Sequence, residues 1–338
     1  MSSEQAPTIV RLNTHTFPMI AEERHVLAAL SHRLVEVEGA TDDEAFAACR
    51  DAEAIMIISA YLHASVIRQL TRCRIISRIG TGVDKIAVDE ATRKGIIVNN
   101  LPDVFTEEVA DHTLALLLAA ALQIKFFDLT MRQGHLPGDF AGLHRLCAQT
   151  AGIIGFGRIG RAVARRCQGF GLRVLACDPC LTPELATREN VTPADLATVL
   201  AESDYICLLC PLLPTTRSML AMPQFKQMKP TAALVNTGRG ELVNEDDLAE
   251  ALRTGIIRHA ALDVFGMVNV FDAEGFPTDH PLFKLDNVLL SPHVAAGSHE
   301  GTVDSRCRGA QAVVDVLTGK WPEHPVDPDV KPWFSLAG

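Results

Sequence analysis

A glycine-rich turn between an apolar run and a helical pattern constrains this chain more than any other feature. The turn, Gly155-Phe-Gly157-Arg-Ile-Gly160, follows a short apolar run at 150–154 and precedes a helical pattern that stops near Gly171. Such a turn points free N–H groups and the positive end of a helix dipole at one spot, where a pyrophosphate can bind. The sequence therefore predicts a dinucleotide-binding unit. The residues of the turn that we expect to line the cofactor are Gly155, Gly157, Arg158, Ile159 and Gly160.

An acidic residue completes this pattern. A second predicted strand, 172–177, ends at Asp178, which follows the last glycine of the turn by 18 residues. A carboxylate at this place can accept both ribose hydroxyls of an adenosine and would repel a 2′-phosphate. The next two residues, Pro179 and Cys180, carry no positive charge. We therefore expect the cofactor to be NAD rather than NADP.

Composition narrows the class of protein. A chain of 338 residues is long enough for two domains, and 48% hydrophobic residues with few aromatics suit an aliphatic α/β core. The net charge is −10 and basic residues are dispersed, which argues against nucleic-acid binding. The N-terminus shows no secretory signal, and the longest apolar run, 114–122, is too short to span a bilayer. These features predict a cytoplasmic protein.

Nine cysteines, an odd number, argue against a disulfide framework. Two pairs, Cys177/Cys180 and Cys207/Cys210, have the Cys-x-x-Cys spacing of a zinc site. Cys177 and Cys207 fall in apolar strand patterns, however, and residues three apart on a strand point to opposite faces. We expect core cysteines and no metal, so a zinc-dependent dehydrogenase remains the weakest alternative.

Alternating strand and helix patterns predict an α/β fold with doubly wound parallel sheets. Strands are expected at 8–11, 51–59, 74–79, 96–99, 150–154, 172–177, 205–210, 232–236, 260–264 and 287–291. Helices are expected at 22–32, 89–94, 107–125 (the longest), 161–170 and 302–318. The six strands from 150 onward match a Rossmann NAD-binding domain, predicted at 103–293. It is inserted into a discontinuous, flavodoxin-like substrate domain, predicted at 1–102 and 294–338.

Two polar side chains follow predicted strands of the nucleotide domain. Arg239 lies in a tight turn after 232–236, and His293 follows 287–291. Ligands bind at the carboxyl ends of strands in open parallel sheets. A guanidinium there can bind a carboxylate in a forked geometry, and a histidine can exchange a proton near neutral pH. Arg239 and His293 are therefore candidate catalytic residues, although a lone histidine is most often structural.

Several spaced motifs resemble those of the D-isomer-specific 2-hydroxyacid dehydrogenase family. They include Gly80-Thr-Gly-Val-Asp84, Glu108-Val-Ala-Asp-His-Thr-Leu-Ala115, Pro211-Leu-Leu-Pro-Thr-Thr216, Asn236-Thr-Gly-Arg-Gly240, Ala261-Leu-Asp-Val-Phe265 and Ser291-Pro-His293. The resemblance implies an NAD-dependent oxidoreductase that interconverts a small 2-keto acid and a D-2-hydroxy acid. It assigns the catalytic arginine to Arg239 and the catalytic histidine to His293. It also implies that the cofactor is lined by Thr81, Cys210, Pro211, Thr237 and Asp263.

The family's catalytic glutamate does not fall at its usual place. It normally follows the residue matching Asp263 by five positions, where this chain has Val268. An ungapped match counted back from His293 instead assigns it to Glu274, with about six extra residues after Phe265. Loops accept insertions at small cost, so Glu274 is the candidate partner of His293, the alternative being a lost glutamate.

The resemblance and the chemistry of reduction assign roles to these residues. His293 would donate a proton to the carbonyl oxygen, Glu274 would orient the imidazole, and Arg239 would bind the substrate carboxylate. The main-chain amides of Gly80, Thr81 and Gly82 are candidate second anchors for that carboxylate.

The substrate class and the assembly follow from weaker signals. Residues 57–63, which contain Tyr61 as one expected wall of the pocket, hold no arginine or lysine for a substrate phosphate. This ranks a small unphosphorylated 2-keto acid above phosphoglycerate. The apolar helix and the following segment, 126–149, predict a homodimer. An NAD-sensing corepressor-like protein with little turnover is the alternative function.

Overall fold

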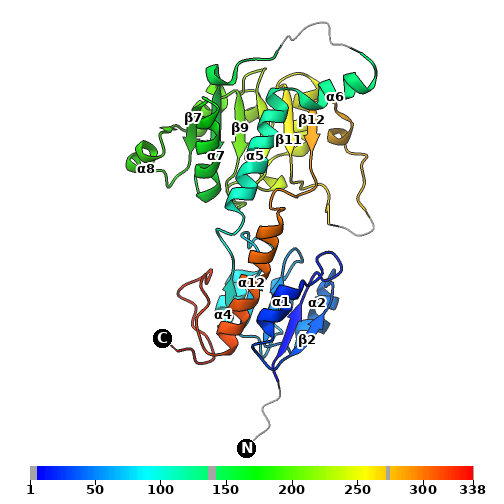
Figure 1. Cartoon of the computed structure of the whole chain (residues 1–338), viewed down its shortest axis with the longest axis vertical. Coiled ribbons are helices and arrows are strands. Elements are labelled where there is room, and N and C mark those ends of the chain that lie inside the picture. The colour runs from blue at the N-terminus through cyan, green and yellow to red at the C-terminus, as the bar shows by residue number, and fades with distance from the viewer. Residues whose placement is uncertain (1–5, 136–141, 272–274, 338) are drawn as a thin grey trace, which may run out of the picture. The chain divides into compact units, whose positions relative to one another are not determined.

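The computed structural model describes residues 6–135, 142–271 and 275–337, and the chain forms two compact units (Figure 1). The first unit comprises Met1–Phe105 with Gly297–Gly338, and the second comprises Thr106–Ala296. The predicted boundaries at 102 and 293 each lie three residues before these divisions. Each unit is described below by itself.

The first unit is built on a parallel five-stranded sheet. Its order is β2-β1-β3-β4-β5, the flavodoxin-like order. Buried apolar residues fill β3, as is usual for a strand covered on both faces. The strands are β1 (Thr8–Arg11), β2 (Arg33–Glu36), β3 (Ala54–Ile57), β4 (Ile75–Arg78) and β5 (Ile97–Asn99).

Helices cover both faces of this sheet. One core contains side chains of α1 (Ala21–Leu27) and α12 (His299–Leu317). The core on the opposite face contains side chains of α2 (Asp42–Cys49), α3 (Ala64–Ile67) and α4 (Val88–Arg93). Helix α12 therefore completes a unit whose other elements lie more than 190 residues earlier in the chain.

The second unit is built on a parallel seven-stranded sheet in the order β12-β11-β10-β9-β6-β7-β8. The order reverses at β6, so the glycine turn that follows β6 lies where dinucleotides bind in such sheets. The strands are β6 (Thr150–Ile154), β7 (Arg173–Cys177), β8 (Thr192–Pro193), β9 (Tyr205–Leu208), β10 (Ala233–Asn236), β11 (His259–Leu262) and β12 (Val288–Leu290).

Two layers of helices enclose this second sheet. Helices α5 (Thr106–Ala121) and α7 (Arg158–Gly169) pack in one core. Helices α9 (Leu196–Glu202), α10 (Met222–Phe225) and α11 (Glu245–Arg253) pack in the other. The remaining elements are α6 (Ile124–Arg132), α8 (Pro183–Arg188), η1 (Leu146–Ala148), η2 (Gly240–Leu242) and η3 (Pro281–Lys284).

The predicted fold class is confirmed, with local corrections. The sequence analysis missed β2 and the helices α2, α3, α8, α9, α10 and α11, and the nucleotide sheet has seven strands rather than six because β8 adds a two-residue edge strand. Strand β2 is only half-buried and is charged at both ends, so it lacks the apolar run that marks the central strands. Strand β8 is fully exposed. These two edge strands therefore gave no hydrophobic signal.

The predicted helix 107–125 is not one helix, nor is it the longest. It ends at Ala121, and Gln123 takes a left-handed φ of +51° before α6 begins. A left-handed residue ends the helical hydrogen-bond pattern, so the chain bends by 59°. Helix α12, with 19 residues against 16 in α5, is longer. Within the described residues no single helix could cross a membrane, although α5 and α6 taken together pass that test by length and composition.

Candidate active site

The three glycines of the turn between β6 and α7 meet three different steric demands. Gly155 has a φ of +96°, and a Cβ there would lie 2.5 Å from the backbone nitrogen of Cys210. A Cβ on Gly160 would overlap the carbonyl oxygen of Gly155. Gly157, in contrast, is exposed, and a Cβ there would meet nothing within 4 Å. The turn is thus tightly folded, and it leaves open space at the N-terminus of α7, which fits a pyrophosphate.

Asp178, just after β7, is bound to this turn. Its Oδ2 accepts a hydrogen bond from the backbone N–H of Phe156 at 2.7 Å, and its Oδ1 accepts one from Cys180 at 2.7 Å. The side chain is half-exposed. Because a carboxylate has about four acceptor sites, it retains acceptors for ribose hydroxyls. Asp178 therefore holds the glycine turn and presents a negative charge beside it.

The other predicted cofactor residues of this unit lie near carboxyl ends of its strands. Arg158 and Ile159 open α7, and Cys210 and Pro211 follow β9. Burial raises the pKa of the Cys210 thiol to about 11. Thr237 is buried after β10, and its hydroxyl lies 2.7 Å from the hydroxyl of Thr113 in α5. That contact directs the Thr237 hydroxyl toward α5.

Arg239 follows β10 in a turn built by Asn236. The Asn236 side chain donates to the Arg239 carbonyl at 2.9 Å and accepts from the Gly238 N–H at 3.1 Å. The Arg239 guanidinium is half-buried and donates to the Gly238 carbonyl at 2.7 Å. The strand end therefore positions both the backbone and the side chain of the predicted carboxylate-binding residue.

His293 follows β12 in a backbone conformation that is rare for a residue with a side chain. Its φ is +55°, in the left-handed region, where a non-glycine residue needs support from its surroundings. The His293 N–H donates to the Asp263 carbonyl at 2.8 Å. The Asp263 carboxylate accepts hydrogen bonds from the N–H groups of Val294 at 3.0 Å and Ala295 at 2.9 Å. The backbone carbonyl and the side chain of Asp263 thus both hold the turn that carries His293.

Two further side chains complete this arrangement. The Ser291 hydroxyl donates to Asp263 Oδ1 at 2.6 Å. His112 of α5 lies with its Nε2 at 3.0 Å from that hydroxyl and at 3.4 Å from Asp263 Oδ1. Asp263 itself is fully buried. Sequence motifs contain Ser291 and His112, but nothing in the spacing showed that they surround Asp263, because they lie 179 residues apart.

The extra segment after Phe265 reaches the same turn. The ring centroid of Phe271 lies 5.1 Å from that of His293, with 39° between the ring planes. At the start of this segment, the N–H groups of Gly266 and Met267 donate hydrogen bonds to the Glu245 carboxylate, both at 2.8 Å. Glu274 lies outside the described residues.

The predicted substrate residues of the first unit cluster around the ends of β3 and β4. Gly80 has a φ of +145°, and a Cβ there would lie 2.5 Å from the Arg78 guanidinium. Arg78 donates to the carbonyls of Ile79 at 2.5 Å and Gly82 at 2.9 Å, so it fills the turn from within. The Gly80 N–H donates to the Arg78 carbonyl, and the Thr81 hydroxyl donates to the Leu101 carbonyl at 3.1 Å. The turn is therefore rigid.

Tyr61, after β3, is half-exposed and lies beside a cation that the sequence analysis missed. The Lys85 ammonium is 4.8 Å from the centre of the Tyr61 ring and donates to the Ser59 carbonyl at 2.9 Å. Residues 57–63 alone hold no arginine or lysine, but the fold supplies one from the loop after β4.

Comparison with known proteins bears on this geometry. Residues 114–295 match the family model described as D-isomer specific 2-hydroxyacid dehydrogenase, NAD binding domain. A glyoxylate reductase of Korarchaeum cryptofilum is 39% identical over 273 residues, which cover 79% of each chain. A D-3-phosphoglycerate dehydrogenase of Methanocaldococcus jannaschii is 37% identical over 88% of this chain but only 58% of its own length. This chain belongs to the D-isomer-specific 2-hydroxyacid dehydrogenase family.

A solved structure agrees with this assignment. The D-lactate dehydrogenase of Aquifex aeolicus, determined with NAD and lactic acid, superimposes with a TM-score of 0.81 at 26% identity, over 92% of this chain and 96% of that one. The predicted family, enzyme class and NAD cofactor are thereby confirmed. The open N-terminus of α7 and the half-exposed carboxylate of Asp178 are the places predicted for this cofactor.

The cysteine pairs differ in burial. Cys207 is fully buried in β9, and burial raises its thiol pKa well above the ordinary value, whereas its spacing partner Cys210 is half-buried. Cys177 is half-buried and Cys180 is exposed. Among the described residues, no group of three or more histidine, cysteine, aspartate or glutamate side chains is arranged to hold a metal ion.

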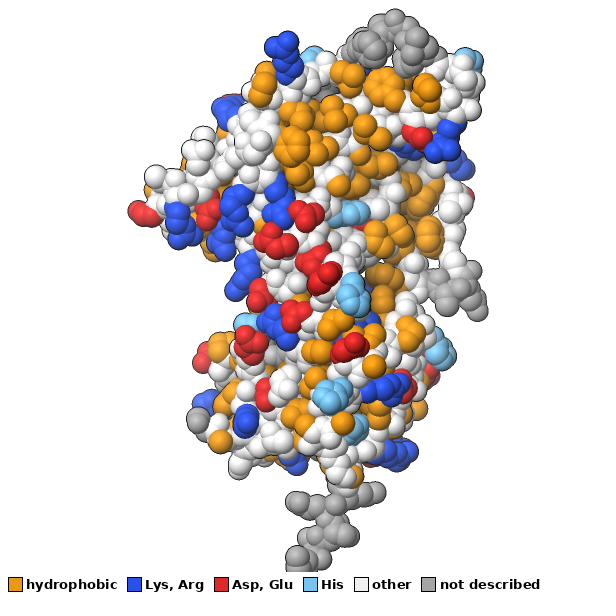
Figure 2. All heavy atoms as spheres, in the orientation of Figure 1, with side chains coloured by type: hydrophobic (Ala, Val, Ile, Leu, Met, Phe, Trp, Pro, Cys, Tyr) orange, Lys and Arg blue, Asp and Glu red, His pale blue; other side chains and the backbone are white. Residues whose placement is uncertain are grey.

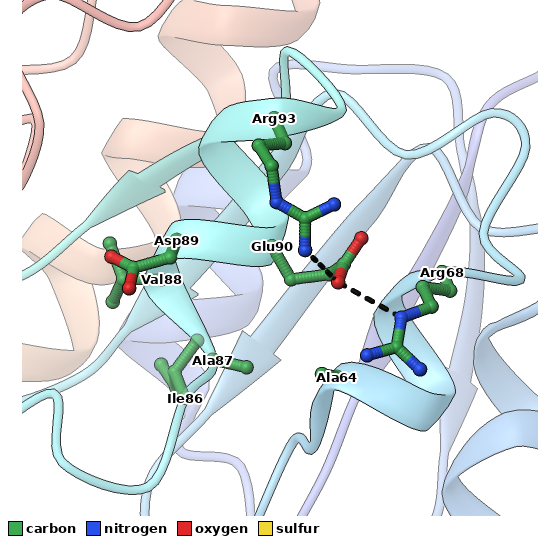
Figure 3. A pocket seen from close by; sticks show the side chains of 8 residues that line it. All are labelled: Ala64, Arg68, Ile86, Ala87, Val88, Asp89, Glu90 and Arg93. Atoms are coloured by element: carbon green, nitrogen blue, oxygen red, sulfur yellow. Dashed lines mark hydrogen bonds and ion pairs between the residues drawn. The ribbon is translucent and has the colours of Figure 1, made fainter.

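A hollow of about 390 Å³ opens on the first unit beside α3 and α4, and none of the predicted site residues lines it (Figure 3). Arg68 and Arg93 both point at the buried carboxylate of Glu90, which pairs with each of them. These three charges are thus directed toward one another, which fits a structural ion-pair cluster in this dehydrogenase, while Asp89 points away from them.

Proposed function

We propose that this dehydrogenase interconverts a small 2-keto acid and the corresponding D-2-hydroxy acid. The observation that carries the proposal is the His293 turn, which the buried Asp263 holds in a left-handed conformation at the carboxyl end of β12. Residues held in such a conformation by their surroundings cluster at active sites. The same sheet carries the glycine turn and Arg239 at other strand ends.

The side chains divide the chemistry between them. His293 supplies a proton to the carbonyl oxygen during reduction and recovers it during oxidation. Arg239 binds the substrate carboxylate, because a guanidinium can donate two parallel hydrogen bonds to it. Its positive charge also stabilises the negative charge that develops on the carbonyl oxygen. NAD, when bound, carries the hydride. Tyr61, Gly80, Thr81 and Gly82 stay predicted substrate ligands, and cytoplasmic location stays a prediction.

Glu274 remains the proposed partner of His293. Support comes from Phe271, three residues earlier in the chain, whose ring contacts the imidazole of His293. The extra segment therefore reaches the histidine even though the usual position after Asp263 holds Val268. A carboxylate beside an imidazole favours its protonated form and fixes its orientation.

A panel of 2-keto acids, assayed through the absorbance of NADH, tests the proposal. Glyoxylate, hydroxypyruvate and branched 2-keto acids should consume NADH, and the product should be the D isomer. If NADH binds but none of these acids is reduced, the protein acts as an NAD-binding sensor with little turnover.

We expect NADH to bind at least tenfold more tightly than NADPH, a difference of about 1.4 kcal/mol, because the carboxylate of Asp178 repels a 2′-phosphate. Fluorescence titration of both cofactors measures this. Asp178→Ala should also weaken NADH binding, since the Phe156 N–H loses its acceptor, so the ratio of the two dissociation constants is the informative quantity. Equal dissociation constants in the unaltered protein would refute the preference.

We expect a homodimer formed through the second unit. Helix α6, which follows α5, carries exposed apolar side chains. The exposed fraction is 53% for Ile124, 50% for Phe126 and 65% for Met131. Figure 2 shows apolar side chains gathered over this part of the second unit. Such a patch indicates a protein–protein surface. Part of the predicted segment, 136–141, lies outside the described residues.

Light scattering at micromolar concentration tests the dimer. Phe126→Glu should shift the mass toward the monomer, because a charge would be buried without a partner. Leu213→Glu is the matched control, since Leu213 is similarly exposed, at 49%, but lies after β9. A monomeric mass for the unaltered protein would count against the prediction.

A further inference from the structure

The segment after Phe265, of which the structure describes residues 266–271, begins at a firmly held point. The Glu245 carboxylate at the start of α11 accepts two N–H groups of the segment, those of Gly266 and Met267. Just before it, Phe265 lies so close to Gly240 that a Cβ on Gly240 would overlap its backbone. Because Gly240 follows Arg239, the segment starts beside the turn that carries the predicted carboxylate-binding residue.

From this point the segment brings an aromatic ring to His293. The Phe271 N–H donates to the side chain of Asn269 at 3.3 Å, which turns the chain locally. The Phe271 ring then lies 5.1 Å, centre to centre, from the His293 ring, at an angle of 39°. Both residues are half-buried, so the contact removes part of the imidazole from water.

The hydrogen bonds of Asp263 do not by themselves orient this imidazole. They fix the backbone of residues 293–295, whereas the imidazole is joined to that backbone through two rotatable side-chain bonds. A ring packed against the imidazole limits that rotation. The face of an aromatic ring also attracts a cation, so it favours the protonated imidazole.

We propose that Phe271 is a positioning residue for His293. The segment that carries Phe271 therefore contributes to the reaction. The proposal deepens the proposed function, because it rests on His293 as the proton donor. Phe271 orients the donor and stabilises its protonated form, and it takes no part in bond making itself.

The connection between β11 and β12 also contains a matched control. The Phe276 ring lies 5.9 Å from that of Phe283, which in turn lies 5.9 Å from that of Phe265. Phe276→Leu removes a half-buried aromatic ring from the same connection without touching His293. Phe271→Leu removes the ring but keeps apolar volume, and Phe271→Tyr keeps the ring.

We expect Phe271→Leu to lower kcat for 2-keto acid reduction about tenfold, while KM and the NADH dissociation constant change less than twofold. The pH at which reduction is half lost should move down by about 0.5 unit, because the protonated imidazole loses its aromatic neighbour. Phe271→Tyr should stay within about threefold of the unaltered kcat, and Phe276→Leu within twofold.

An unchanged kcat and pH profile in Phe271→Leu, or an equal loss in Phe276→Leu, would overturn the proposal. NMR titration of the His293 ring protons, assigned by their disappearance in His293→Gln, gives a readout that needs no turnover. A downward shift of the titration midpoint in Phe271→Leu supports the contact even if the unaltered protein reduces no keto acid. A shifted midpoint without turnover would reject the proposed function and keep the electrostatic role of Phe271. Turnover of 2-keto acids with an unshifted midpoint in Phe271→Leu would reject the Phe271 proposal alone.

Discussion

Glu274→Gln should lower the rate of 2-keto acid reduction by roughly 10²–10⁴-fold, the usual contribution of positioned acid–base groups. Without the carboxylate the imidazole gives up its proton at lower pH, so the loss should grow as pH rises. The NADH dissociation constant should barely change, because Glu274 is proposed to act on His293 and not on the cofactor. Steady-state kinetics between pH 5 and 9 measures both effects.

Asp279→Asn is the matched control for this variant. Asp279 lies on the same connection and is exposed. Its replacement by asparagine removes one negative charge, as Glu274→Gln does. It should leave the rate and the pH profile within twofold of the unaltered values. Unaltered turnover and an unaltered pH profile in Glu274→Gln would show that the glutamate has been lost from this chain.

Asp263→Asn should lower the free energy of unfolding by about 2–5 kcal/mol, because it leaves buried donors without acceptors. The carboxylate accepts hydrogen bonds from the hydroxyl of Ser291 and from the N–H groups of Val294 and Ala295. An asparagine would turn its NH₂ group toward one of them. Since the His293 turn then relaxes, we also expect kcat to fall about 10²-fold, the scale of a misplacement of about 1 Å.

Urea denaturation and steady-state kinetics test this variant together. Asp195→Asn serves as the control, because Asp195 caps α9 at the surface and asparagine caps a helix equally well. Its stability should change by less than about 0.5 kcal/mol. If Asp263→Asn unfolds at the same urea concentration as the unaltered protein, Asp263 does not hold the His293 turn.

The parallel, doubly wound sheets could be predicted because their central strands are covered on both faces. Strands such as Ala54–Ile57 and Tyr205–Leu208 are fully buried, so they appear in the sequence as short apolar runs. The edge strands β2 and β8 are half-buried or exposed and left no such pattern. The break at Gln123 was also missed, because a single left-handed residue leaves the apolar pattern on both sides intact.

The glycine turn illustrates what local sequence determines about the site. Strand, three glycines, helix and acid lie within about thirty residues, so their spatial relation follows from chain geometry alone. The structure added that Asp178 itself accepts a hydrogen bond from the turn it accompanies. Arg239 and His293 were also predictable, since the carboxyl ends of parallel strands share one edge of the sheet.

By itself, therefore, the sequence determined the family, the fold class, the NAD cofactor and the candidates Arg239 and His293, through short motifs and through the alternation of strand and helix patterns. Only the tertiary structure decided what surrounds them. Ser291 and His112 meet at Asp263 because β11, β12 and α5 pack together, and Phe271 meets His293 through the connection that follows Phe265. Such contacts depend on the path of the whole chain, and spacing in the sequence carries no information about them.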